Sequence, residues 1–249
     1  MSVSINPDNA PRPLVVIAEK YQSLQGPWHS HRRTQLVYAS QGIITVSIPS
    51  GRWVVPPQRA VWILPNTLHA VSSVQPFWLH TLYAEQDSLM LPRDCGVVSV
   101  SPLIQQLLVA AADFGMDYPI HGKEERLMRT LVDWLPLTPV APLYLPQPQD
   151  IRLKKITTAL EENMTTQISL DNIAQTHGLT ERTAARLFIK ETGLTFGQWR
   201  QQLRLLCALQ KLAQGEKVTS VAFDVGYQDV SSFISLFKKA FGTTPGQYL

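Results

Sequence analysis

The sequence has little cysteine and no long apolar run. Its 249 residues include two cysteines, Cys95 and Cys207, and two isolated thiols favour a reducing compartment over a disulfide scaffold. No stretch reaches the roughly 18 apolar residues that a membrane span needs. The first residues also lack the basic and apolar segments of a signal peptide. We therefore expect a cytoplasmic protein with no membrane partner.

An excess of one charge is also nearly absent, since the formal net charge is only +3. Residues 1–147 contain ten Lys or Arg and ten Asp or Glu, whereas residues 148–249 contain twelve and nine. The small basic excess therefore lies wholly in the C-terminal part. It agrees with a nucleic-acid partner but is too weak to establish one.

What the N-terminal part does contain is a series of short β-branched and aromatic runs separated by glycine and proline turns. The runs are Leu14–Ala18, Gln35–Ser40, Ile43–Ile48, Ala60–Leu64, Phe77–Tyr83 and Val97–Val100. Many short strands at such spacing predict a small barrel or sandwich.

From Ser101 the pattern becomes helical, with Pro102 at a typical first helical position and a second amphipathic segment before residue 135. Five prolines within residues 136–149 predict an extended linker. Everything after Asp150 has a helical pattern. We predict an α+β chain of two domains: a β-barrel over residues 1–100 with a helical hairpin over 101–135, and, after the 136–149 linker, an all-α domain over 150–249.

The C-terminal domain repeats itself. Ile173-Ala174-x-x-x-Gly178-Leu179 recurs 48 residues later as Val221-Ala222-x-x-x-Gly226-Tyr227. A period near 50 in only two copies indicates duplication of one supersecondary unit.

Each copy has the ingredients of a helix-turn-helix. In the first, Ser169 can cap a helix, Gly178 can end it in a left-handed conformation, and Thr180 can cap the next helix. Gly226 and Asp229 take the matching positions in the second. We predict helix-turn-helix units over about 169–191 and 218–240, joined by a long helix that would place both second helices on one face of DNA, about 34 Å apart. Any small helical bundle has Ala and Gly at its crossings, but two copies in the same order favour DNA binding.

This region resembles the AraC/XylS family of bacterial transcription regulators. The resemblance covers residues 150–249, and its most specific segment, residues 221–245, reads VAFDVGYQDVSSFISLFKKAFGTTP. It implies a regulator and not an enzyme, with double-stranded promoter DNA as partner, and RNA polymerase as well if the protein is an activator. Activation and repression are not distinguished.

The resemblance also implies which residues read DNA. In the first recognition helix, the implied base-reading residues are Arg182, Thr183, Ala185 and Arg186; an arginine there can pair bidentately with guanine. In the second, they are Val230, Ser231 and Ser235, which lack a long basic side chain and predict weak base reading. The phosphate-contacting candidates are Lys238, Lys239, Arg200 and Arg204. The alternative for the arginines is phosphate contact or solvated surface, and for the lysines it is solubility alone.

The N-terminal segments Gly26-Pro-Trp-His29-Ser-His31-x-x-x-Gln35 and Pro65-x-x-x-His69 resemble the two motifs of cupins. In metal-binding cupins two His, one Glu and a later His converge inside the barrel, but Gln35 stands here in place of Glu and is a poorer ligand. We expect no cofactor, with a divalent metal at His29, His31 and His69 as the alternative. A further alternative is that the histidines are hydrogen-bonded in the core or line an organic pocket.

The leading hypothesis is a homodimeric, sequence-specific regulator controlled by a small-molecule effector in the barrel. The expected effector-binding residues are His29, His31, Gln35, Trp62 and His69, the tryptophan as one of several aromatics in this domain. The 101–135 hairpin would form the dimer, or would pack on its own barrel instead. Rival hypotheses are a metal-dependent cupin enzyme and a ligand-independent structural DNA protein. The sequence names neither effector nor operator.

Overall fold

The computed structural model describes residues 6–86, 92, 94–136 and 143–248. The chain divides into two compact units: the first contains residues 1–48 and 55–141, and the second contains residues 49–54 and 142–249. The main break falls inside the predicted linker, of which residues 137–142 lie outside the described residues. None of the described helices is both long and apolar enough to cross a membrane.

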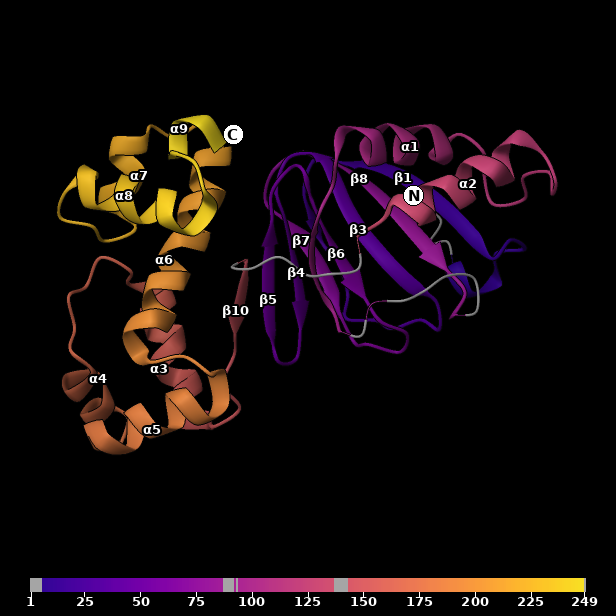
Figure 1. The fold of residues 1–249 in the computed structure, drawn as a ribbon. Helices are drawn as coiled ribbons and strands as arrows, with labels where there is room; N and C mark the ends of the chain where they lie inside the picture. Colours follow the sequence, from indigo (N-terminus) through magenta and orange to yellow (C-terminus); the bar gives the residue numbers. More distant parts are fainter. Residues whose placement is uncertain (1–5, 87–91, 93, 137–142, 249) are drawn as a thin grey trace. The chain divides into compact units, whose positions relative to one another are not determined.

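The first unit is built on antiparallel strands (Figure 1). Its larger sheet has the order β1-β8-β3-β6-β9, formed by β1 (Leu14–Tyr21), β8 (Phe77–Ala84), β3 (Thr34–Gln41), β6 (Arg59–Ile63) and β9 (Gly96–Ser99). In a second sheet β7 (Ala70–Ser73) lies between β4 (Ile44–Ile48) and β2 (Leu24–Gln25). A 3-10 turn over Pro7–Asn9 precedes β1. The predicted β-rich domain is confirmed, although β2, β7 and the strand over residues 51–55 were not among the predicted runs.

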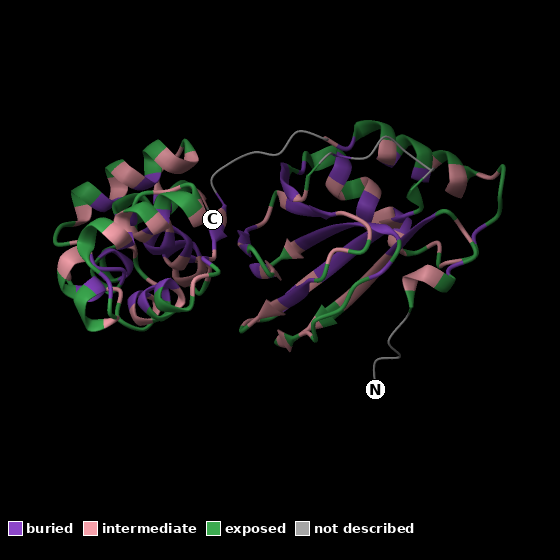
Figure 2. Cartoon of the chain, turned by 90° about the horizontal axis from the view of Figure 1, so that it is seen from below, coloured by how far each residue is buried: buried purple, intermediate pink, exposed green. Residues whose placement is uncertain are grey.

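Two helices, α1 (Pro102–Ala112) and α2 (Lys123–Trp134), cover one face of the larger sheet. Ser101 caps α1 by accepting a hydrogen bond from the backbone N–H of Ile104, 3.3 Å away, as the Ser-Pro pair predicted. The core beneath the helices includes Leu14, Val16, Leu36, Tyr38, Trp62 and Leu82 from the strands and Ile104, Leu108, Met128 and Leu131 from the helices. Figure 2 shows these strands as mostly buried.

The larger sheet is buried on both faces. In β3 the six residues from Thr34 to Ala39 are all buried, so side chains pointing to either face avoid water. A strand of this kind shows a continuous apolar run and no polar-apolar alternation. For that reason the sequence could locate the strand but not the face that each residue occupies.

The second unit is mainly helical (Figure 1). Its helices are α3 (Ile151–Glu162), α4 (Leu170–Thr176), α5 (Glu181–Thr192), α6 (Phe196–Ala213), α7 (Val218–Asp224), α8 (Val230–Phe241) and α9 (Pro245–Tyr248). It also contains a short antiparallel ladder in which β10 (Tyr144–Pro146) pairs with β5 (Gly51–Val55). The Pro-rich composition predicted extended backbone at β10 but gave no sign of its pairing.

Aromatic rings fill the two halves of the helical bundle. The Phe188 ring centroid lies 5.5 Å from Phe196 and 6.2 Å from Trp199 in one half. In the other half, Phe233 and Phe237 lie 5.8 Å apart. All four of these phenylalanines and Trp199 are buried, and edge-to-face contacts at such distances stabilise a core beyond their buried area. Each recognition helix is therefore held by its own aromatic cluster.

Candidate functional site

The first helix-turn-helix consists of α4, a turn at Gly178 and α5. Ser169 caps α4 through the N–H of Asn172 and Thr180 caps α5 through the N–H of Thr183, which confirms both predicted caps. Gly178 has φ +71°, a conformation that favours glycine. Across the turn, the N–H of Leu179 donates to the carbonyl of Ala174 at 2.9 Å.

The second unit, α7 and α8, repeats this turn. Gly226 has φ +87°, and the N–H of Tyr227 donates to the carbonyl of Ala222 at 2.9 Å, the same bond that Leu179 makes in the first unit. Asp229 caps α8 by accepting from the N–H of Ser232 at 2.7 Å. The duplication inferred from the sequence is therefore present in the hydrogen bonds of the two turns.

On α5, the two arginines that the sequence selected are exposed. Arg182 and Arg186 lie one helical turn apart, on the same side of the helix. Thr183 and Ala185 are half-buried, and the Thr183 hydroxyl accepts a hydrogen bond from that of Thr180 at 2.9 Å. Thr183 is thus already engaged in the cap, whereas the two guanidinium groups extend into solvent.

On α8, Ser231 and Ser235 are exposed and Val230 is half-buried at the first position. Lys238 and Lys239 are exposed in the last turn. The outward side chains of α8 are therefore short along most of the helix, and they are basic only at its C-terminal end.

The prediction that Arg204 contacts phosphate needs correction. Arg204 is 9% exposed, and its Nη2 donates to the carbonyl of Met164 at 3.0 Å. Burial lowers the pKa of this guanidinium, which packs 5.8 Å from the centroid of the Tyr227 ring. Arg204 therefore supports the second turn from inside. Arg200 differs, since it is half-buried and its Nη1 donates to the carbonyl of Ile168 at 2.8 Å.

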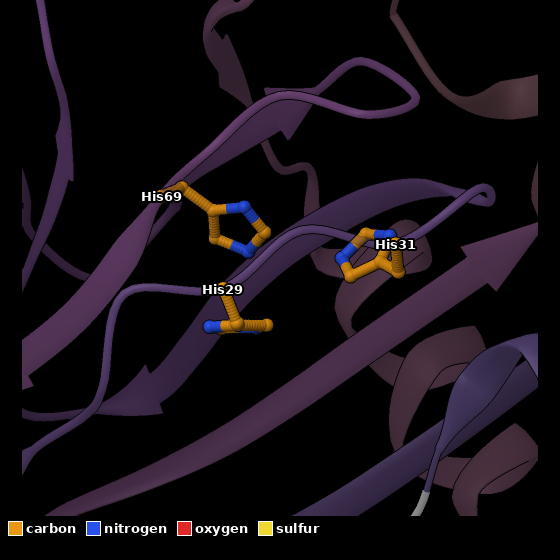
Figure 3. Close-up of side chains that lie close together, drawn as sticks. All are labelled: His29, His31 and His69. Atoms are coloured by element: carbon orange, nitrogen blue, oxygen red, sulfur yellow. The ribbon is translucent and has the colours of Figure 1, made fainter.

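In the first unit, the predicted histidines come together. His29 and His69 form an antiparallel bridge, each backbone N–H donating to the other's carbonyl at 2.9 Å. The His31 ring centroid lies 5.9 Å from that of His29 and 5.1 Å from that of His69. Figure 3 shows the three rings gathered around one space. One ring nitrogen from each histidine lies within 4.8 Å of one from each of the others.

Main-chain carbonyls hold the three rings in the same tautomer. Nδ1 of His29 lies 3.0 Å from the carbonyl of Pro27, Nδ1 of His31 lies 2.7 Å from that of Arg33, and Nδ1 of His69 lies 2.8 Å from that of Thr67. A carbonyl oxygen only accepts, so each Nδ1 carries a proton. In the neutral ring the lone pair is then on Nε2.

Gln35 and Tyr83 complete the cluster. Gln35 Oε1 lies 3.1 Å from His31 Nε2, and Gln35 Nε2 lies 3.1 Å from the Tyr83 hydroxyl. Tyr83 is directly opposite Gln35 in the β3–β8 register, so the two side chains share a face of the sheet. Burial, and then the charge of Glu19, raise the pKa of Tyr83 to about 12. Sequence reasoning did not assign Tyr83 to the site, because its place there depends on the register between β3 and β8.

Burial also lowers the pKa of His69 to about 4, so this ring is neutral at neutral pH. Trp62, in contrast, is not part of the cluster. It is opposite Leu36 in the β3–β6 register and belongs to the core under the helices. Its indole N–H donates to the carbonyl of Pro136 at 3.0 Å. The structure therefore does not bring Trp62 together with the other predicted effector-site residues, because its side chain points to the opposite face from Gln35.

Comparison with known proteins decides the family. Residues 13–108 match the AraC-like ligand binding domain, and residues 173–249 match a helix-turn-helix domain. The chain is 36% identical over 226 residues to the HTH-type transcriptional regulator NimR of Escherichia coli, covering 91% of this chain and 83% of NimR. The chain belongs to the AraC family of transcriptional regulators.

Other relatives are more distant, in coverage or in sequence identity. The transcriptional regulator RipA of Corynebacterium glutamicum is 32% identical over 132 residues, 52% of this chain and 38% of RipA. A crystal structure of ToxT from Vibrio cholerae with an unsaturated fatty acid bound aligns with a TM-score of 0.41 at 13% identity, over 94% of each chain, too distant a likeness to bear on this chain.

As a member of the AraC family, this protein is a DNA-binding transcriptional regulator with a ligand-binding N-terminal domain, and not an enzyme. The histidine cluster, Gln35 and Tyr83 lie within the matched ligand-binding domain. The helices α5, α7 and α8 lie within the matched helix-turn-helix domain.

Proposed function

We propose that this regulator reads base sequence mainly with α5 and follows the DNA backbone mainly with α8. The observation that carries this division is the difference between the outward surfaces of the two helices. Arg182 and Arg186 extend from α5 into solvent, whereas α8 presents serines and, at its end, Lys238 and Lys239. Long guanidinium groups reach base edges in the major groove, and lysines at a helix end neutralise phosphates.

The helix α6 supports the use of both units on one duplex. It packs against α5 at one end and α7 at the other, and nine of its side chains are buried. A helix held so closely keeps the two recognition helices at a constant separation. Two adjacent major-groove segments, about 34 Å apart, are the DNA sites that such an arrangement fits.

In the first unit, the proposed effector site is the cluster of His29, His31, His69, Gln35 and Tyr83. These side chains provide several polar groups, with His31, Gln35 and His69 buried and His29 exposed, and a specific small-molecule site requires a few such groups. An effector there would favour one of two states of the regulator that differ in DNA affinity. The cytoplasm, where the promoter DNA lies, is the proposed site of action.

The proposed partners besides DNA are a second copy of this chain and, for an activator, RNA polymerase. Support for the homodimer comes from the outer surface of the α1–α2 hairpin, where Leu103 is 45% and Trp134 61% exposed. Large apolar side chains exposed on neighbouring helices are typical of surfaces that pair.

The test is fluorescence anisotropy of the full chain with DNA from upstream of its own and neighbouring genes, over a salt series and with non-specific competitor. Tight binding that survives the competitor, with affinity falling steeply with salt, is expected of a sequence-specific regulator. Weak binding to every DNA alike, unchanged by any effector, would instead fit a structural DNA protein and contradict the proposal.

A further inference from the structure

His29, His31 and His69 of the first unit share one hydrogen-bond pattern. Each has its Nδ1–H fixed by a main-chain carbonyl two residues away, namely Pro27 for His29, Arg33 for His31 and Thr67 for His69. This leaves the lone pair of each neutral ring on Nε2. Metal-ligating histidines characteristically donate their other N–H to a carbonyl or carboxylate, which fixes the ring and makes the ligating nitrogen more basic.

We propose that His29, His31 and His69 bind one divalent transition-metal ion through their Nε2 atoms. Three neutral imidazoles suit Zn²⁺, Co²⁺, Ni²⁺ or Cu²⁺, whereas Mg²⁺ and Ca²⁺ require oxygen ligands. The proposal names the chemical class of a ligand for the effector site described above. Its regulatory consequence rests on that proposed function, but the binding of the ion does not.

The buried end of the cluster supports an ion over a purely structural role. His69 is fully buried, and within the described part of the chain its Nε2 has no hydrogen-bond partner. An orphaned buried polar atom is costly unless something binds it. A metal ion shared with His31 and His29 would satisfy this nitrogen, and no nearer protein group does so.

The hydrogen bonds of His31 also favour an ion. Its Nδ1 donates to a carbonyl, so in the neutral ring Nε2 has a lone pair directed at Gln35, 3.1 Å away. That contact is favourable only if Gln35 turns its amide N–H₂ toward the ring or if the ring is protonated. An ion on Nε2 removes this conflict, because the Gln35 amide oxygen then faces a cation.

Only a small adjustment is needed to form the site. One ring nitrogen from each histidine already lies within 4.8 Å of one from each of the others, and ligands of a tetrahedral ion with bonds of 2.0–2.1 Å lie about 3.3 Å apart. His29 is exposed, so its ring can rotate toward the ion without disturbing the core. Three protein ligands leave a position open, beside Gln35, for water or for an effector atom.

The experiment is a titration of the full, tag-free chain with Co²⁺, after treatment with a chelator, followed by visible absorption and calorimetry, with Zn²⁺ and Ni²⁺ as competitors. We expect one ion per chain and an absorption spectrum of nitrogen-coordinated Co²⁺. Removal of an outer hydrogen-bond partner of a metal ligand weakens metal binding by roughly 10–100-fold. His29→Ala removes a ligand itself, so its loss of affinity for the ion should be larger than that. His69→Gln should abolish the spectrum.

His80→Gln and His121→Ala are matched controls. His80 is a buried histidine of the larger sheet outside the cluster, and His121 is an exposed histidine on the loop before α2; both variants should bind Co²⁺ as the unaltered chain does. Since His29 is exposed, His29→Ala should keep its circular dichroism and apo melting temperature, and the ion should raise its melting temperature less than that of the unaltered chain.

No saturable binding of any of the three ions would overturn the proposal. Binding that is equally tight in the unaltered chain, His29→Ala and His69→Gln would overturn it as well, because the ion would then lie elsewhere. The titration contains no DNA, so its result is independent of whether the chain binds a promoter.

Discussion

The guanidinium of Arg204 lies directly against Gly226 in the second helix-turn-helix. A Cβ added to Gly226 would stand 2.8 Å from Nη2 of Arg204 and 2.5 Å from the carbonyl oxygen of Met164, which accepts a hydrogen bond from the same Nη2. The matching Gly178 of the first unit has nothing within 4 Å of an added Cβ. The two turns share a backbone conformation, but only the second is closed by a buried arginine.

Gly226→Ala is therefore expected to destabilise the protein more than Gly178→Ala. Both substitutions place a Cβ on a left-handed residue, at a cost of about 1–2 kcal/mol, and only Gly226→Ala adds a clash with backbone and a buried cation. Urea unfolding of the two variants measures the difference. Equal losses of unfolding free energy would contradict the asymmetry between the turns.

Arg204→Ala is expected to reduce stability while leaving the salt dependence of DNA binding unchanged, because the side chain packs inside and does not reach phosphate. Lys238→Ala should have the opposite effects. Its unfolding free energy should stay within about 0.5 kcal/mol of that of the unaltered chain, and the slope of log DNA affinity against log salt concentration should become shallower by about 1. Thermal unfolding and anisotropy over a salt series give the two readouts. If Arg204→Ala also made the salt dependence of DNA binding shallower, Arg204 would be a phosphate contact after all.

Arg186→Ala is expected to cost about 1–3 kcal/mol of binding to the specific site and to relax the choice of base there. The physical reason is the loss of a bidentate contact to guanine. Lys190→Ala is the matched control, since Lys190 is an exposed cation on the same helix, in its last turn. The measurement is the affinity of each variant for a set of operators that differ by one base pair. If Arg186→Ala and Lys190→Ala discriminate equally well among these operators, Arg186 contacts phosphate and not a base.

His80 is expected to contribute acid sensitivity. It is fully buried, and burial lowers its pKa below the ordinary value of about 6.5. The unfolded chain therefore binds the proton first, and the stability from neutral His80 is present above pH 6.5 and lost as the pH falls below it.

The measurement is urea unfolding of the unaltered chain and of His80→Gln at pH 7.5, 6.5 and 5.5. The unfolding free energy of the unaltered chain should fall more steeply with acidification than that of the variant. A difference between the two chains that stays constant with pH would show that His80 does not titrate in this range.

The helix-turn-helix units could be predicted from the sequence because their signals are local. Ser169, Thr180 and Asp229 each cap a helix through a backbone N–H three residues on, and Gly178 and Gly226 mark the turns by their conformation alone. No distant part of the chain is needed to read these signals.

The face of Trp62 could not be predicted, for a physical reason. Helices cover one side of the larger sheet and polar cluster residues such as Gln35 are buried on the other, so burial does not alternate along β3 or β6. Without alternation, the sequence does not give the side to which a residue points. Tyr83 was missed for the same reason, since its role depends on the register with Gln35.

The burial of Arg204 also depends on long-range contacts. The buried residues of α6 do not form a single stripe, since Arg204 and Leu205 are buried as well as Leu203 and Leu206. This helix has neighbours on more than one side, and Gly226, 22 residues further along the chain, leaves space for the guanidinium. Local periodicity carries no information about such a neighbour.

The unbroken helix α6 also limits which operators the protein can accept. Because it joins the two recognition units without a hinge, it fixes the angular phase between them as well as their separation. A base pair inserted between two half-sites would turn the second by about 34° around the duplex axis, and α6 has no flexible joint with which to follow. Operators for this regulator should therefore vary freely in the bases between the half-sites but hardly at all in their number.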